Sequence, residues 1–148
     1  MLSNATLSLD RPFDADRTFG LWQALVAPDG RFVYVTIFTA GSVTVVDTLK
    51  QAVLKSIPNV GGGMGIAATP DGRHVLVTNE LDGTLAVIDT VNQAIAKIIP
   101  VGKFPTGVAV TSDSRYAYVT NTDVSTISQK SQPQIQADGI PNGASNRF

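Results

Sequence analysis

The chain has 148 residues, of which 43% are hydrophobic, and this is enough to bury the core of one modest domain. Its 11 Lys and Arg and 12 Asp and Glu give a formal net charge of -1, and the basic residues occur singly, which excludes the basic footprint of a nucleic-acid-binding protein. The absence of cysteine excludes disulfides and thiolate metal sites, and no apolar run approaches the roughly 18 residues of a membrane-spanning helix.

Residues 1–21 form an N-terminal segment ahead of the first repeat. Its start, "MLSNATLSLDRPF", lacks the basic residues and apolar core of a secretory signal peptide, so we expect no signal peptide in the chain as given. The stretch "ATLSLD" at 5–10 has the length of a strand. It could supply a closing strand to an incomplete sheet of the same chain or of a second copy.

An internal repeat organises the next hundred residues. "PDGRFVYVT" starts at residue 28, "PDGRHVLVT" at 70 and "SDSRYAYVT" at 112, an equal spacing of 42 residues. "VTVVDTLKQAVLKSIP" (43–58) matches "LAVIDTVNQAIAKIIP" (85–100) at the same offset. Because a repeat of this length is one supersecondary unit, the period predicts an array of like modules.

Each unit predicts four short strands. A strand of small residues precedes the turn at "PDGR", and β-branched or aromatic runs such as "FVYVT", "VTVVD" and "AVLKSIP" follow, bounded by turn residues. In "FVYVT", apolar side chains point to both faces, which indicates a sheet covered on both sides. Four-stranded antiparallel sheets at this period are typical of a β-propeller, with blades at 22–58, 63–100 and 105–128.

The stretch "NVGGGMGIAATPDG" at 59–72 raises the question of a phosphate-binding loop. One period later, Gly63 corresponds to Pro105, which has no amide hydrogen for an anion. The stretch also lacks the Gly-Lys-Ser/Thr ending and the following helix that a phosphate loop needs. We interpret it as a connector between repeats.

The motifs "VYVT", "VLVTN", "YVTN", "TLAVIDT" and "IPVGKFPTGVAVT" resemble the YVTN-type propeller repeats of surface-layer and other exported prokaryotic proteins, over residues 22–127. The resemblance implies an all-β propeller and an extracellular, cell-surface or periplasmic location. The pattern departs at Ile37, where asparagine is usual, and after Ser128. There the expected third and fourth strands give way to a polar tail, residues 129–148, interpreted as disordered or a linker.

Three blades are too few, because propellers close with typically four to eight. An isolated arc would leave two apolar faces in water. We therefore expect closure by homo-oligomerisation, with a dimer favoured because two copies make six blades, or by the rest of a larger propeller.

The turns of the predicted propeller lie on two opposite rims. Those after strands one and three are nearly invariant along the chain, whereas those after strands two and four differ, and variation on one face of a repeat array usually marks the binding face. We call this face the variable rim; it comprises residues 37–41, 79–83 and 121–125 and the connections 59–64 and 101–106. With Trp22 at the start of the first strand, its candidate binding residues are Trp22, Phe38, Asn79, Glu80, Asp82, Lys103, Phe104 and Asn121. The alternative is that these aromatics cover loop bases and the polar groups cap turns.

Other polar residues are interpreted as structural. Asp29, Asp71 and Asp113 recur at the first turn of each unit, where aspartate bonds its own backbone, and Asp47 and Asp89 recur before the third turn. His74, the single histidine, takes the position of Phe32 on the second strand, which indicates packing between blades. No catalytic residue is assigned, and one histidine without cysteine disfavours a zinc site or a Ser-His-Asp triad.

Three hypotheses about function remain. The favoured hypothesis is a non-enzymatic module that binds a protein, a sugar or another small molecule through the variable rim. The alternatives are a propeller enzyme of lactonase, lyase or hydrolase type, with a site at the channel mouth, and an inactive structural fragment. No cofactor is predicted, although Asn79, Glu80 and Asn121 could contribute oxygen ligands to a divalent cation such as Ca²⁺.

Overall fold

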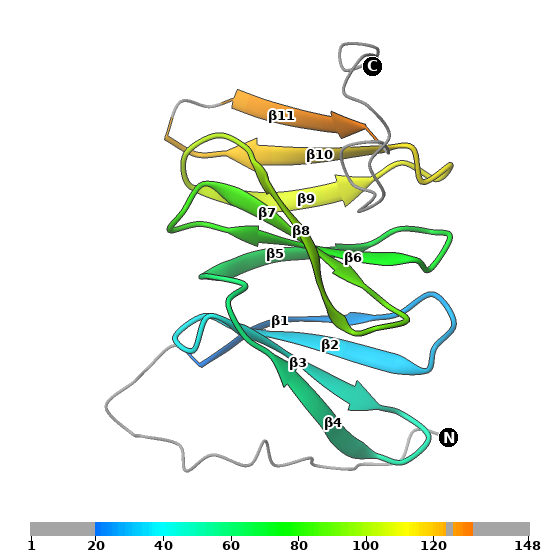
Figure 1. The fold of residues 1–148 in the computed structure, drawn as a ribbon. Coiled ribbons are helices and arrows are strands. Elements are labelled where there is room, and N and C mark those ends of the chain that lie inside the picture. Colours follow the sequence, from blue (N-terminus) through cyan, green and yellow to red (C-terminus); the bar gives the residue numbers. More distant parts are fainter. Residues whose placement is uncertain (1–19, 124–125, 132–148) are drawn as a thin grey trace.

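The computed structural model describes residues 20–123 and 126–131, whose regular elements are strands in three antiparallel sheets (Figure 1). The first sheet contains β1 (Leu21–Val26), β2 (Phe32–Ile37), β3 (Ser42–Asp47) and β4 (Ala52–Ile57). The second contains β5 (Gly63–Ala68), β6 (His74–Asn79), β7 (Thr84–Asp89) and β8 (Ala94–Pro100). The third contains β9 (Pro105–Val110), β10 (Tyr116–Asn121) and β11 (Thr126–Ser131). Within each sheet, neighbours in space are neighbours in sequence, as the repeat predicted.

The first turn of each repeat is built by its aspartate. The Oδ1 atoms of Asp29, Asp71 and Asp113 each accept a hydrogen bond from the backbone N–H two residues later, at 2.9–3.0 Å. Gly30 and Gly72 in these turns have φ angles of 72° and 73°, in the left-handed region that glycine adopts without strain. The structural interpretation of these aspartates is confirmed.

The third turn follows the same logic. Asp47 Oδ1 accepts hydrogen bonds from the N–H groups of Leu49 and Lys50, both at 3.0 Å. Asp89 makes the equivalent pair at 2.9 and 2.7 Å. The bond from the Lys50 amide is the main reason that the pKa of Asp47 lies below its ordinary value. These carboxylates therefore hold turns and do not form an acid pair.

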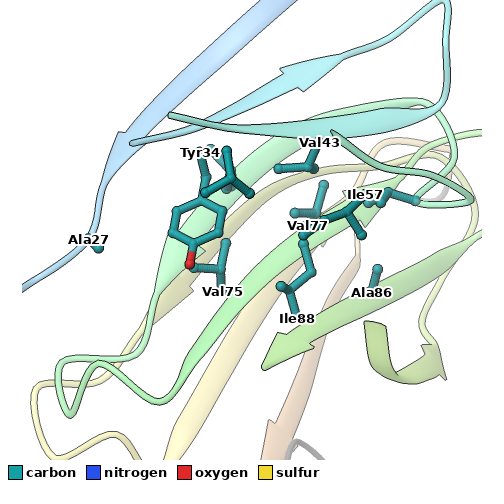
Figure 2. Close-up of a cluster of buried hydrophobic side chains, with 11 residues drawn as sticks. Ala27, Tyr34, Val43, Ile57, Val75, Val77, Ala86 and Ile88 are labelled. Carbon is teal, nitrogen blue, oxygen red and sulfur yellow. The ribbon is translucent and has the colours of Figure 1, made fainter. Parts of the chain in front are cut away.

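The middle sheet is covered on both faces, and its β6 is buried at every position. One core cluster joins its first face to the first sheet through Tyr34, Val45, Val75 and Ile88. In Figure 2 the Tyr34 ring points from the first sheet towards Val75 of the second. A second cluster joins its other face to the third sheet, with Leu76 against Val119. The expectation of a sheet covered on both faces is thus met in the second sheet, and in the first sheet β3 is likewise buried at every position.

The strands β1, β5 and β9 lie side by side at the inner edge of the three sheets (Figure 1). Polar contacts join them to neighbouring sheets: Gln23 Oε1 accepts a hydrogen bond from the Ile66 amide at 3.1 Å. Thr78 Oγ1 donates to the Thr106 carbonyl at 3.0 Å. The three sheets therefore form an arc in which equivalent strands face a common axis.

The third sheet corrects one expectation. Its third strand, β11, runs to Ser131, beyond the boundary at residue 128 where the repeat was expected to lose this strand. β11 pairs with β10 along its whole length, from Asn121↔Thr126 to Tyr116↔Ser131. The polar run "TISQKS" forms a strand because the ladder to β10 satisfies its backbone groups, a requirement that does not depend on apolar side chains. The closing strand expected at 5–10 and the remainder of the tail lie outside the described residues.

Candidate functional site

The variable rim is held together by backbone hydrogen bonds between its loops. The Val60 amide, in the connection after β4, donates to the Gly41 carbonyl in the β2–β3 loop at 2.9 Å. One period later, the Val101 amide donates to the Gly83 carbonyl at 2.9 Å. Each connection between sheets is therefore fixed against the β2–β3-type loop of the sheet that it leaves.

Asn79 and Asn121 lie at the base of this rim and are 4% and 2% exposed. Asn79 Oδ1 accepts a hydrogen bond from the Gly62 amide at 3.2 Å, and Asn121 Oδ1 accepts one from the Gly102 amide at 3.0 Å. The Asn121 amide also donates to Ser128 Oγ at 2.9 Å. Both side chains anchor the connections between sheets, the role that the alternative interpretation gave to the polar groups.

Glu80 and Asp82 follow Asn79 in the β6–β7 loop. Asp82 is exposed, and its Oδ2 accepts a hydrogen bond from Asn79 Nδ2 at 2.8 Å. Glu80 is half-buried, and its backbone amide donates to the Gly62 carbonyl at 3.1 Å. Asp82 therefore supports the asparagine, while the Glu80 carboxylate adds negative charge to the rim.

Apolar side chains gather beside these groups. The rings of Trp22 and Phe38 lie 6.3 Å apart with their planes inclined at 44°. A Cβ placed on Gly62 would lie 2.8 Å from the Phe38 ring and 3.3 Å from Leu81 Cγ, so Phe38 and Leu81 flank this glycine. Trp22 is 49% exposed and Leu81 68% exposed. Trp22 therefore pairs with Phe38, and Phe38 lies with Leu81 around Gly62; we call these three side chains the apolar cluster of the rim.

The next connection carries Lys103 and Phe104. Phe104 is 47% exposed, has a φ angle of 49°, and its carbonyl accepts hydrogen bonds from Thr122 N and Oγ1, both at 3.1 Å. Lys103 Nζ lies 3.9 Å from Asp123 Oδ2, and both side chains are exposed. Such an exposed ion pair contributes little to stability, which leaves both charges accessible to a ligand.

Three amides of the glycine-rich connection are already hydrogen-bonded within the chain. The Gly62 amide is bound by Asn79, the Gly63 amide by the Gly61 carbonyl, and the Gly65 amide by Thr78 Oγ1. A strand, β5, follows it, where a phosphate loop requires a helix. Its interpretation as a connector is confirmed.

The described residues offer no group of three or more His, Asp and Glu side chains that could hold a metal ion. Asn79 and Asn121 use their side-chain oxygens on backbone amides, so a cation at Glu80 would have to compete with these bonds. His74, at 5% exposure in the middle sheet, is inaccessible from the rim. No helix able to cross a membrane occurs in residues 20–123 and 126–131.

Leu81 is the rim residue that sequence reasoning missed. The signal was present, because a leucine in a loop between two polar neighbours, Glu80 and Asp82, has no core to join. A groove of about 230 Å³ was also not foreseen; it lies at the β4 end and the β7–β8 turn, where Lys55, Pro58 and Gln93 are among its lining residues. This groove is not part of the variable rim.

Comparison with known proteins shows the family of the chain. The family model described as a YNCE-like beta-propeller matches residues 18–115. No curated protein sequence matches the chain.

Solved structures match the arc as a fold. Hydrazine synthase of Kuenenia stuttgartiensis aligns with a TM-score of 0.75 and 24% identity, over 89% of this chain and 37% of that one. The protein of Bacteroides fragilis described as a "putative 6-phosphogluconolactonase" aligns with a TM-score of 0.69 and 20% identity, over 80% and 37%. Its counterpart from Bacteroides uniformis gives 0.70 and 19%, over 80% and 38%. The chain thus spans less than two fifths of the length of these proteins.

Proposed function

The chain belongs to the YNCE-like β-propeller family, and from this premise we propose that it is a binding module which engages a protein partner through the variable rim. The observation that carries the proposal is the apolar cluster of Trp22, Phe38 and Leu81 on loops that differ between repeats. Exposed aromatic and aliphatic side chains grouped in this way are the usual anchors of protein interfaces.

The charged side chains near this cluster resemble the polar border of a protein interface. Glu80 and Asp82 flank Leu81 in the sequence, and the Lys103–Asp123 pair lies on the same rim, so both signs of charge accompany the apolar anchors. Interfaces commonly combine an apolar centre with a polar, solvent-accessible border of this kind. Phe104, on the same rim one connection further, extends the apolar surface towards the third sheet.

A rigid base supports these anchors. Asn79 and Asn121 tie the connections to the sheets, and the Val60 amide holds the β2–β3 loop through the Gly41 carbonyl. The loops that carry Phe38, Leu81 and Phe104 are therefore ordered before a partner arrives. Pre-ordered loops lose less conformational freedom on binding. The exported or cell-surface location implied by the repeat type suits such a module and is part of the proposal.

Trp22 makes the test direct, because it is the single tryptophan of the chain and lies on the proposed surface. Peptides selected from a displayed library on the immobilised chain are titrated against it, and Trp22 emission and calorimetry are recorded. We expect selected peptides to shift the emission and to lose at least tenfold in affinity on Trp22→Ala or Phe104→Ala.

The matched control is Val91→Ala, an 87% exposed residue in the β7–β8 turn of the opposite rim. Binding that is unchanged by the Trp22 and Phe104 substitutions, or that depends on Val91, would overturn the proposal. A glycan array on the same immobilised chain gives the other outcome: sugar capture abolished by Trp22→Ala would replace the protein partner by a carbohydrate.

A further inference from the structure

We propose that two copies of this chain close head to tail into one six-sheet ring, with the third sheet of each copy covering the first sheet of the other. The inference rests on the packing of the three sheets and does not depend on what the variable rim binds. Within the chain, each interface between neighbouring sheets joins one face that points forward along the chain to one face that points back. The two end faces of the arc are one of each kind, so they are complementary.

One kind of face points towards the next sheet. In the first sheet it carries an aligned row, one residue per strand: Leu25, Tyr34, Val45 and Lys55. The first three pack on the second sheet, and Lys55 is exposed. The row at the equivalent positions of the second sheet faces the third: Ala67, Leu76, Val87 and Lys97. The third sheet repeats it as Ala109, Tyr118 and Gln129. We call these the forward rows.

The other kind of face points towards the preceding sheet. In the second sheet it carries an aligned row that packs on the first sheet: Ala68, Val75, Ile88 and Ile95. The first sheet has four valines in register at the equivalent positions: Val26, Val33, Val46 and Val53. We call these the back rows.

Exposure shows which rows lack a neighbour. Tyr34 and Leu76, at the centre of the two internal forward rows, are both 0% exposed, whereas the equivalent Tyr118 is 39% exposed. Val26 and Val53, at the ends of the first back row, are 58% and 39% exposed, whereas Val46 between them is 7% exposed. One forward row is therefore open and one back row is open at its two ends, and they are the two halves of the interface that the chain makes twice within itself.

A hydrogen-bonding group at the open forward face supports the same pairing. Thr78 Oγ1, at the internal interface, accepts from the Gly65 amide and donates to the Thr106 carbonyl of the next sheet. The equivalent Thr120 Oγ1 is exposed, accepts from the Gly107 amide at 2.9 Å and shares a hydrogen bond of 3.1 Å with Thr106 Oγ1 of its own sheet. The position equivalent to Thr106 in a first sheet is Trp22, so Thr120 would donate to the Trp22 carbonyl of the second copy while Thr106 Oγ1 donates to Thr120.

The geometry also limits the assembly. A head-to-tail interface forms a closed ring when its rotations add to a full turn and a filament when they do not. Two copies supply six sheets, within the range of about four to eight at which propellers close. The pairing would bring Trp22 of one copy beside the end of β10 of the other, which joins the two variable rims into one.

The first test is molar mass by light scattering across a dilution series of the full chain. We expect twice the monomer mass, and a return to monomer mass in Tyr118→Asp and in Val26→Asp, each of which places a charge on one open row. Val91→Asp, on an exposed turn away from both rows, is the matched control and should stay dimeric. Circular dichroism checks that each variant keeps its strands.

Mixing the two monomeric variants tests the direction of packing. Tyr118→Asp keeps an intact back row and Val26→Asp an intact forward row, so an equimolar mixture should recover a one-to-one complex through one unmodified interface. If instead two forward faces or two back faces paired with each other, the mixture would form no such one-to-one complex. A monomeric wild-type chain, which is the outcome if further sheets of a longer polypeptide cover these faces, or a mixture that stays monomeric, would overturn the proposal.

A cysteine cross-link gives an independent reading, because the chain has no cysteine of its own. A Cβ on Gly63 would lie 3.2 Å from Thr36 Cβ across the first internal interface. The equivalent pair between copies is Leu21 and Thr120. We expect Leu21→Cys and Thr120→Cys, mixed and oxidised, to form a covalent dimer that neither variant forms alone; absence of this product would count against the pairing.

Discussion

The side chain of Asn79 holds the backbone of Gly62 by a hydrogen bond of 3.2 Å, and this contact fixes the path of the chain from the first sheet into the second. The third sheet repeats the contact between Asn121 and Gly102 at 3.0 Å. In the first sheet the position is Ile37, which cannot accept such a bond. The asparagine that ends the "VTN" motif is therefore a clamp on the connection between sheets.

Removing this clamp should destabilise the fold. Asn79→Ala leaves the Gly62 amide without its partner in a buried site, so we expect a loss of about 1–3 kcal/mol in the free energy of unfolding. Urea denaturation measures it. The matched control is Asn92→Ala, an exposed turn residue whose replacement should change stability by less than about 0.5 kcal/mol. If Asn79→Ala and Asn92→Ala lowered the free energy of unfolding equally, the Asn79 hydrogen bond would not be holding the connection between the sheets.

Gly61 should tolerate no side chain while Asn79 is present. Its φ angle is 76°, and an added Cβ would overlap the Asn79 carboxamide. Gly72 has nearly the same φ, 73°, but nothing within 4 Å of an added Cβ. Gly72→Ala should therefore cost only the left-handed backbone strain, about 1–2 kcal/mol, and Gly61→Ala clearly more.

A double-mutant cycle isolates the steric part of this difference. In the Asn79→Ala background, Gly61→Ala should cost no more than Gly72→Ala does in the wild-type chain. Thermal or urea unfolding gives all the required values. An unchanged cost of Gly61→Ala in that background would show that the overlap with Asn79 is not its cause.

Tyr34 carries a hydroxyl that has no hydrogen-bond partner within the described structure, although the side chain is 0% exposed. An unsatisfied buried polar group costs about 1–3 kcal/mol, so Tyr34→Phe should raise the unfolding free energy by about 1 kcal/mol. The ring and its contacts with the second sheet remain. A loss of stability in this variant would mean that the hydroxyl is bound.

The same hydroxyl predicts a response to alkali. Burial, with smaller contributions from the charges of Asp29 and Asp89, raises the pKa of Tyr34 to about 12. Because the folded protein resists ionisation of Tyr34, its stability is unaffected by this ionisation below the unfolded pKa of about 10. Stability then falls as the pH rises from that value towards 12. Stability measured from pH 9 upwards should fall less steeply in Tyr34→Phe than in the wild-type chain.

The turn aspartates predict a response to acid of the opposite sign. Hydrogen bonds from Thr111 Oγ1 and the Arg115 amide lower the pKa of Asp113, and the Lys50 amide lowers that of Asp47. Stability from these groups is present above their unfolded pKa of about 4 and is lost as the pH falls through the folded values. Asp113→Asn should therefore flatten the decline in the urea midpoint below pH 4; an unaltered decline would exclude a contribution from this turn.

The repeat made most of the fold predictable. Strands, turns and their order depend on local preferences and on a two-residue alternation, and both can be recognised in each copy of the unit. The roles of Asp29, Asp71 and Asp113 were predictable for the same reason, because their hydrogen bonds reach only two residues along the chain. β11 was missed because backbone pairing with β10, and not side-chain hydrophobicity, forms it.

The candidate site was only partly predictable. The variable rim and its aromatics could be found by comparing the repeats with one another. That Asn79 and Asn121 are buried clamps, while Leu81 joins Trp22 and Phe38, depends on contacts between loops far apart in sequence. The alternation of apolar and polar residues along each strand carries no information about contacts between distant loops.

The sequence by itself determined the repeat, the strands and the turn chemistry, because these follow from residues within a few positions of one another. Tertiary structure alone decided which apolar residues are covered. Tyr34 and Tyr118 occupy the same position in their repeats, yet they are 0% and 39% exposed. The difference arises because a neighbouring sheet stands in front of one and not of the other, and burial is a property of that neighbour as much as of the residue itself.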